Sequence, residues 1–195
     1  MSNRNKAIFI DKDGTLIPDI PYNVNPDLIT IEDEVIQGLQ LLKEEGYVLI
    51  VISNQSGVAR GYFTIDALKD VERRITALLT RHQIKIAGFY FCPHHPNGNT
   101  EAYAKECDCR KPQPGMILKA CEEHNIDASK SWMIGDILND VEAGNRAGCK
   151  TVLVDNGNET EWEAGEYRTP TYLAMTFSKA AQFIIEHTKE AVETA

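Results

Sequence analysis

Two aspartates one residue apart, Asp11 and Asp13, are the side chains best placed to do chemistry. They follow an apolar run at 7–10. An extended backbone puts residues two apart on the same side, and a run that is apolar on both faces predicts a strand buried in a parallel sheet. Such sheets bind ligands beyond the carboxyl ends of their strands. Two carboxylates there can share Mg²⁺ or divide the roles of nucleophile and acid. The alternative is an ordinary Asp-Gly turn with both side chains in water.

A second strand end carries groups that suit a phosphate. Ser53 follows the apolar run 47–52 and opens a stretch of small hydrogen-bonding residues that reaches Gly61. Its hydroxyl and the following backbone N–H groups could cradle a phosphate, and Arg60 could add positive charge. The alternative is a glycine-rich loop that only covers the end of the sheet.

A third strand end adds another carboxylate. Asp136 follows the run 131–134 and can complete a Mg²⁺ site with Asp11. Asp140 stands one helical turn later and could orient Asp136 or Lys111. A helix cap and a first-turn aspartate that complements the helix dipole would explain the same two residues.

Three cysteines and a histidine stand in two tight pairs, Cys92-x-His94 and Cys107-x-Cys109. They predict a closed, tetrahedral Zn²⁺ site, which is structural because four protein ligands leave no open position. His95 could replace His94 as the ligand. Reduced cysteines scattered in a loop are the alternative to a metal site.

Arg110 and Lys111 come directly after the last of these cysteines, so the zinc loop would deliver two cations to one place. Lysine suits a point charge on a transferring phosphoryl oxygen, and arginine suits a bidentate grip on a second anionic group. A solvated basic pair is the alternative.

Composition limits the class of protein. The chain has 195 residues and a formal net charge of -9, which argues against a nucleic-acid partner. No apolar run is long enough to span a bilayer, and no signal-peptide pattern precedes the first strand, so we expect a cytoplasmic protein without a membrane partner. Disulfides are then not expected, and Cys121 and Cys149 are interpreted as small core residues.

Strands and helices alternate along the chain, which predicts one doubly wound α/β domain over 1–195 with helices on both faces of a parallel sheet. The zinc loop, 92–109, is inserted in it, and 156–195 is the least regular part. The expected strands are 7–10, 47–52, 84–91, 131–134, 151–154 and 171–175, and the expected helices are 34–45, 65–82, 114–124, 137–147 and 177–189. The proline-rich loop 17–30 either contacts substrate through 19–22 or is a plain connector. The spacing leaves no room for a separate cap domain.

Asp-x-Asp-Gly-Thr, a serine at a strand end, a lysine and Gly-Asp-x-x-x-Asp, in this order on alternating strands and helices, resemble the haloacid dehalogenase-like (HAD) phosphatase superfamily over about 7–155. The resemblance implies that Asp11 is the nucleophile and that Asp13 is the acid and base. It implies that Mg²⁺ is held by the Asp11 carboxylate, the Asp13 backbone carbonyl and Asp136. Ser53 and Lys111 would steady the phosphoryl group during transfer.

The zinc-loop motif and the run Cys-Arg-Lys-Pro-x-Pro-Gly-Met are similar to those of the heptose 1,7-bisphosphate 7-phosphatase and histidinol-phosphatase branch. The stretches 53–57 and 92–96 favour the heptose enzymes. The resemblance implies hydrolysis of the C7 phosphate of D-glycero-D-manno-heptose 1,7-bisphosphate, with histidinol phosphate or another small sugar phosphate as the alternative. It also implies a set of substrate-binding residues: Asp19, Ile20, Pro21, Tyr22, Asn54, Gln55, Ser56 and Arg110.

One position departs from that pattern. Heptose enzymes often have a basic residue directly after the first aspartate of Gly-Asp-x-x-x-Asp, and this chain has Ile137 there, after Asp136. We expect the core chemistry to be unaffected, with a change in substrate affinity or preference. A monomer is expected. Two alternative functions come from other classes of protein. The net charge disfavours a zinc-knuckle nucleic-acid binder, and the intact motif residues disfavour a catalytically silent binding module.

Overall fold

The computed structural model describes the backbone of residues 4–193 and the side chains of residues 4–189. The predicted domain, 1–195, therefore has its first three and last two residues outside the described part. None of the helices in the described part is both long and apolar enough to cross a membrane.

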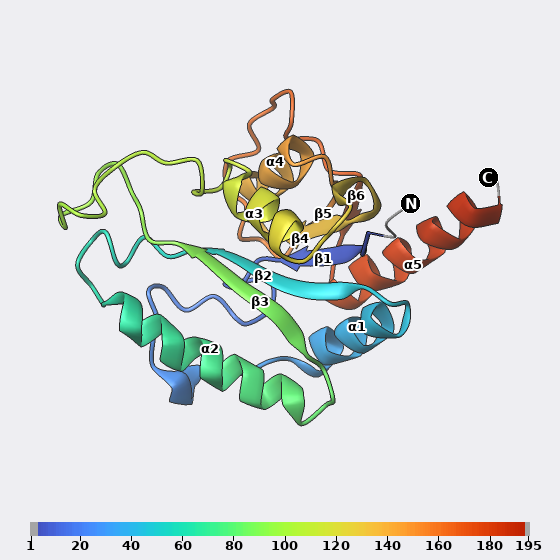
Figure 1. Cartoon of the computed structure of the whole chain (residues 1–195), viewed down its shortest axis with the longest axis horizontal. Coiled ribbons are helices and arrows are strands. Elements are labelled where there is room, and N and C mark those ends of the chain that lie inside the picture. Colours follow the sequence, from blue (N-terminus) through green and yellow to red (C-terminus); the bar gives the residue numbers. More distant parts are fainter. Residues whose placement is uncertain (1–3, 194–195) are drawn as a thin grey trace.

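Six parallel strands form one sheet in the order β3-β2-β1-β4-β5-β6 (Figure 1). They are β1 (Ala7–Ile10), β2 (Val48–Asn54), β3 (Ile86–Cys92), β4 (Trp132–Gly135), β5 (Lys150–Val154) and β6 (Tyr172–Ala174). The chain builds outward from β1 to β3 and then returns to the other side of β1 with β4. The order of the strands thus reverses between β1 and β4, which is where doubly wound sheets bind ligands.

Helices cover both faces of the sheet, as the apolar strands require. They are α1 (Asp33–Glu44), α2 (Ile65–Thr80), α3 (Gly115–Glu123), α4 (Leu138–Arg146) and α5 (Phe177–Glu193), with short 3-10 turns at Pro26–Leu28 and Ala128–Lys130. In Figure 1, α1, α2 and α5 lie on one side of the sheet, and α3 and α4 lie on the other.

Alternation along β1 divides the core between these two layers. Ile8 and Ile10 pack in the cluster that includes α1, α2 and α5, whereas Phe9 packs in the cluster that includes α3 and α4. All four β1 side chains are fully buried, so β1 is a rigid support for the residues that follow it.

The structure confirms the predicted order of elements and shifts several bounds. The helix expected at 34–45 spans 33–44, with Glu32 directly before it. The strand expected from residue 84 starts at 86, because Ile84 N still bonds Leu79 O at the end of α2. Cys149 is buried as expected, but Cys121 is only half-buried.

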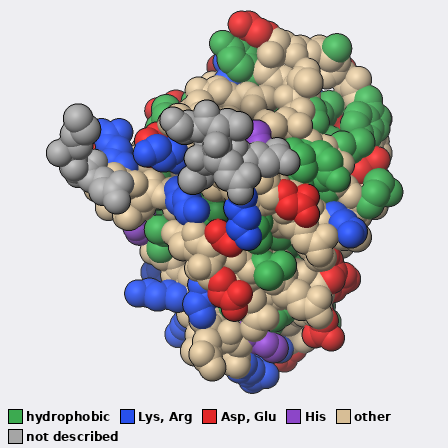
Figure 2. Space-filling model, turned by 90° about the vertical axis from the view of Figure 1, so that its right-hand side faces the viewer, with side chains coloured by type: hydrophobic (Ala, Val, Ile, Leu, Met, Phe, Trp, Pro, Cys, Tyr) green, Lys and Arg blue, Asp and Glu red, His purple; other side chains and the backbone are tan. Residues whose placement is uncertain are grey.

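The face near both termini carries interspersed lysine, arginine, aspartate and glutamate side chains (Figure 2). The carboxyl ends of the strands lie at the opposite side of the molecule, where the loop 93–106 projects beyond the sheet (Figure 1).

Candidate active site

Three buried carboxylates meet where β1 and β4 end. Asp11 follows β1, Asp136 follows β4, and Asp140 lies in the first turn of α4. Each offers an oxygen within 4.8 Å of the others. Lys111 forms ion pairs with Asp11 and, at 2.5 Å, with Asp140, and it donates a 3.0 Å hydrogen bond to Ile52 O.

This donor set suits a divalent cation. Three carboxylates face one buried ammonium group, so negative charge remains uncompensated, and hard oxygen ligands are those that Mg²⁺ prefers. The structure thus brings Asp11 and Asp136 together as expected. It adds the Asp140 carboxylate, for which the sequence suggested only an orienting role.

Burial perturbs the titration of this cluster. Burial raises the pKa of Asp11 to about 7, against the lowering effect of the Lys111 ammonium, and the nearby Asp140 carboxylate adds to the rise. Burial also raises the pKa of Asp136 to about 6. Burial lowers the pKa of Lys111, but its two carboxylate partners outweigh this effect and raise it overall. Lys111 is therefore charged, while the carboxylates are poised to exchange protons for a metal ion.

Residue 14 must be glycine because the side chains of Asp136 and Asn158 lie too close to its backbone for a Cβ. Its φ is +83°, and a Cβ there would lie 2.0 Å from Asp136 Oδ2 and 2.5 Å from Asn158 Nδ2. Glycine alone tolerates both the backbone conformation and the contact. The Asp13-Gly14 turn thus packs directly against the predicted metal ligands.

The Asp13 carboxylate has different partners from the other three. Its oxygens lie 2.5 Å from Lys12 Nζ and 2.9 Å from Gln55 Nε2. Gln55 Nε2 also donates to Ser53 Oγ at 2.8 Å. Ser53, Gln55 and Asp13 thus form one hydrogen-bonded group beside Asp11.

A cavity of about 290 Å³ opens at this group. Seven of the predicted site residues line it, together with Asn23 and Gly57: Asp13, Asp19, Pro21, Tyr22, Asn54, Gln55 and Ser56. Ile20 and Arg110, predicted as substrate contacts, are not among the lining residues. The loop 19–22 is held beside the cavity by Tyr22, whose ring packs edge-on against Tyr62 with centroids 4.7 Å apart.

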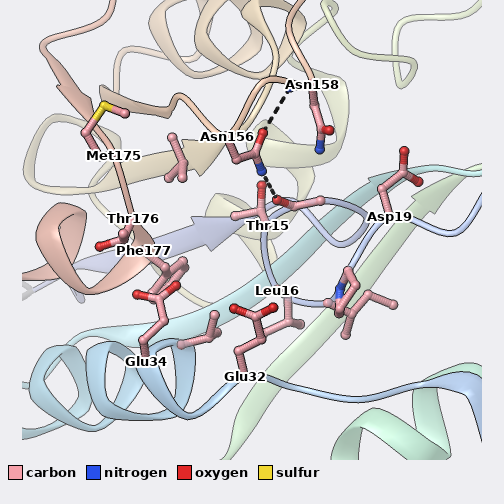
Figure 3. A pocket seen from close by; sticks show the side chains of 15 residues that line it. Thr15, Leu16, Asp19, Glu32, Glu34, Asn156, Asn158, Met175, Thr176 and Phe177 are labelled. Atoms are coloured by element: carbon pink, nitrogen blue, oxygen red, sulfur yellow. Dashed lines mark hydrogen bonds between the residues drawn. The ribbon is translucent and has the colours of Figure 1, made fainter.

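A second cavity of about 350 Å³ is lined by Gly14 and Thr15 and shares Asp19 with the first (Figure 3). Its lining includes the carboxylates of Asp19, Glu32 and Glu34. Asp19 lines both cavities, whereas Glu32 and Glu34 add negative charge only to the second, so the cavity beside Asp13 is the better entrance for a phosphate ester.

Asn54 has a contact that the sequence did not predict. Its side-chain amide donates to Lys111 O at 3.0 Å, and its Oδ1 accepts from Lys111 N at 3.0 Å. Asn54 thus fixes the backbone that carries Lys111, while one side of it still lines the cavity. No pattern in the sequence linked these two residues, which come from different loops.

Arg110 belongs to a cluster of cationic side chains. Arg60 Nη2 lies 3.3 Å from His95 Nε2, and Arg110 Nη1 donates to His94 O at 3.4 Å. Burial, with the charges of Arg110 and Arg60, lowers the pKa of His95. Burial also lowers the pKa of Arg110, and Arg60 contributes to that change. Within the part of the chain whose side chains are described, neither guanidinium forms an ion pair with a carboxylate.

Cys92, His94, Cys107 and Cys109 come together as the sequence predicted. Their sulfurs are 3.1 to 3.4 Å apart, and His94 Nδ1 lies 3.4 Å from Cys109 Sγ. These separations approach the tetrahedron edge of about 3.7 Å that Zn–S bonds of about 2.3 Å require. His95 points instead to Arg60, so the geometry favours His94 as the fourth ligand. The cluster could hold Zn²⁺.

The loop after β5 supplies contacts that the sequence analysis missed. Asn158 Nδ2 donates to Asp136 Oδ2 at 2.6 Å, and Asn156 Nδ2 donates to Gly14 O at 2.7 Å. Glu159 Oε2 accepts from Leu138 N at 2.6 Å, at the start of α4. The polar stretch from residue 156 has no periodicity that would have indicated these contacts.

Comparisons with known proteins identify the family of this chain. The HAD-hydrolase-like family model matches residues 108–180. The D-glycero-beta-D-manno-heptose-1,7-bisphosphate 7-phosphatase of Pasteurella multocida is 46% identical over 153 residues, 78% of this chain and 83% of that one. The enzyme of the same name from Escherichia coli K12 is 41% identical over 81% of this chain and 83% of its own. The D,D-heptose 1,7-bisphosphate phosphatase from B. bronchiseptica, solved with magnesium and phosphate, superposes with a TM-score of 0.80 at 26% identity over 93% of this chain and 99% of its own. The chain therefore belongs to the HAD-like phosphatases, in the family of the heptose 1,7-bisphosphate 7-phosphatases.

Proposed function

We propose that this protein is a Mg²⁺-dependent phosphatase that hydrolyses the C7 phosphate of D-glycero-D-manno-heptose 1,7-bisphosphate. The observation that carries the proposal is the buried Asp11 carboxylate, held between Lys111 and the Asp136 carboxylate where the strand order reverses. The names of the family relatives supply the substrate.

Asp11 and Asp13 divide the chemistry. An oxygen of Asp11 attacks phosphorus, the bond from phosphorus to the C7 oxygen breaks, and Asp13 gives that oxygen its proton. Asp13 then takes a proton from a water molecule that attacks the aspartyl-phosphate, which releases phosphate and restores Asp11. Support comes from their positions, since Asp11 is buried at the strand end and Asp13 lies at the cavity.

Electrostatics stabilise the transferring group. Lys111 provides a buried positive charge beside Asp11, and Ser53 provides a hydroxyl group. Asp11 and Asp136 would hold Mg²⁺, with the Asp13 backbone carbonyl as a further ligand. When bound, Mg²⁺ supplies a positive charge that offsets the charge on the phosphoryl oxygens.

The cationic cluster favours a bisphosphate over histidinol phosphate. Arg60 and Arg110 lack carboxylate partners among the described residues, and the buried Arg60 Nε has no hydrogen-bond partner there. A second phosphate group would satisfy Arg110 with charge-assisted bonds. The amine and imidazole of histidinol phosphate would instead meet like charge. The Zn²⁺ held by Cys92 and its partners would keep the loop folded and Arg110 in place.

The test is phosphate release from the heptose bisphosphate and from histidinol phosphate, measured in parallel with and without Mg²⁺. We expect Mg²⁺-dependent release with strong preference for the bisphosphate. Arg110→Gln should raise KM for the bisphosphate more than for a sugar monophosphate. Preference for histidinol phosphate would overturn the substrate, and release without Mg²⁺ would overturn the metal-dependent mechanism.

A further inference from the structure

Donors from two different loops hold the Asp136 carboxylate. Asn158 Nδ2 donates to Asp136 Oδ2 at 2.6 Å, and Thr15 Oγ1 lies 3.4 Å from Asp136 Oδ1. The shorter contact comes from Asn158, so Asn158 is the stronger constraint on the carboxylate.

The loop that carries Asn158 is tied to the site at two further points and is braced by one hydrogen bond of its own. Asn156 Nδ2 donates to Gly14 O at 2.7 Å, and Asn156 Oδ1 accepts from Asn158 N at 3.1 Å. Glu159 accepts from Leu138 N, at the start of α4. Figure 3 shows the two asparagines side by side, with Asn156 directed at the turn that holds Thr15. These contacts aim the Asn158 amide at Asp136.

We propose that Asn158 is a positioning residue for the metal site, and that its amide fixes the Asp136 carboxylate in the orientation that binds Mg²⁺. The inference rests on the Mg²⁺ site of the proposed function. Asp136 is 4% exposed, so water gives its oxygens little orientation, and protein donors must do so.

An amide suits this role better than a cation. A positive side chain beside Asp136 would compete with Mg²⁺ for the carboxylate, whereas the neutral amide orients it without adding charge. Residue 137 is isoleucine and offers no side-chain donor to its neighbour Asp136, so the amide of Asn158 supplies a donor in its place. Asn158 itself is exposed, so its replacement leaves the core intact.

The experiment measures Mg²⁺ binding to the zinc-loaded protein by calorimetry, without substrate. Asn158→Ala removes the donor, Asn158→Gln returns an amide on a longer arm, and Thr160→Ala is the control from the same loop with an exposed side chain. We expect Asn158→Ala to weaken Mg²⁺ binding about tenfold, the lower end for residues that support metal ligands. Asn158→Gln should recover part of the loss, and Thr160→Ala should match the unaltered protein.

Activity on p-nitrophenyl phosphate gives a second readout. Asn158→Ala should need more Mg²⁺ for half-maximal rate but reach a similar kcat at saturating Mg²⁺. Melting temperatures without Mg²⁺ should fall by no more than the few degrees that one lost hydrogen bond costs, because the core is unchanged.

Four results would overturn the inference. Unchanged Mg²⁺ affinity in Asn158→Ala, while the unaltered protein binds Mg²⁺, refutes it and leaves the proposed function standing. An equal loss in Thr160→Ala, or no recovery in Asn158→Gln, assigns the effect to loop packing instead of the amide. Absence of Mg²⁺ binding by the unaltered protein refutes both the inference and the metal chemistry of the proposed function.

Discussion

Replacing Lys111 by methionine should destabilise the protein strongly at alkaline pH and less in acid. The Lys111 side chain is 3% exposed and is the cation that faces both Asp11 and Asp140. Removing one partner of a buried ion pair leaves unpaired charge and typically costs about 3–5 kcal/mol. For a chain of this size, that corresponds to a fall in melting temperature of about 6–20 °C.

The pH dependence follows from the raised pKa of Asp11, about 7 even with Lys111 present. A carboxyl group whose pKa is raised in the folded state contributes stability that is present below its ordinary pKa of about 4 and is lost as pH rises through the folded-state value. Without Lys111 the folded-state pKa rises further, so the carboxylates take up protons in acid and the unpaired charge disappears. The free energy lost by Lys111→Met should therefore be large near about pH 8 and much smaller near about pH 5.

Urea unfolding without added Mg²⁺ measures this loss directly. Lys119→Met is the matched control, because Lys119 is exposed and lies 3.8 Å from its partner Glu123, so we expect no measurable change. A loss for Lys111→Met below about 1 kcal/mol at alkaline pH, or an equal loss at both pH values, would refute the reasoning.

Three further predictions follow from the same geometry. Cys107→Ala should release Zn²⁺ and lower the melting temperature, and activity should fall because Arg110 and Lys111 are displaced. Full zinc stoichiometry in this variant would contradict the ligand set. Gly14→Ala should abolish Mg²⁺ binding measured by calorimetry, because its Cβ would lie 2.0 Å from Asp136 Oδ2; normal binding would show that the turn can move aside. Mg²⁺ affinity should fall as pH drops through about 7 and about 6, where Asp11 and Asp136 bind protons in the metal-free protein; an affinity independent of pH in this window would contradict it.

The convergence of the site could be predicted because parallel strands carry their following residues to one edge. Asp11, Ser53 and Asp136 each follow a short apolar run, and each lies where that rule places it. The zinc cluster could be predicted equally well, since ligand type and spacing identify it without knowledge of the fold.

Contacts made by loops were beyond sequence reasoning. The direction of Asn158 depends on a turn through Gly157, whose φ is +90°, and on anchoring bonds to residues far away in the chain. Asn54 lies at the strand end where a substrate contact was expected, but its bonds to Lys111 depend on how two loops meet. Strand periodicity indicates the side on which a residue lies, not the partner that it finds there.

The most direct test of the account is the fate of the phosphoryl group at Asp11. Protein quenched in acid during turnover of heptose 1,7-bisphosphate with Mg²⁺ should carry one phosphoryl group on the peptide that contains Asp11. Asp11→Asn should show neither this modification nor phosphate release, while it keeps its fold and its zinc. Substantial phosphate release by Asp11→Asn, or modification of another residue, would contradict the account.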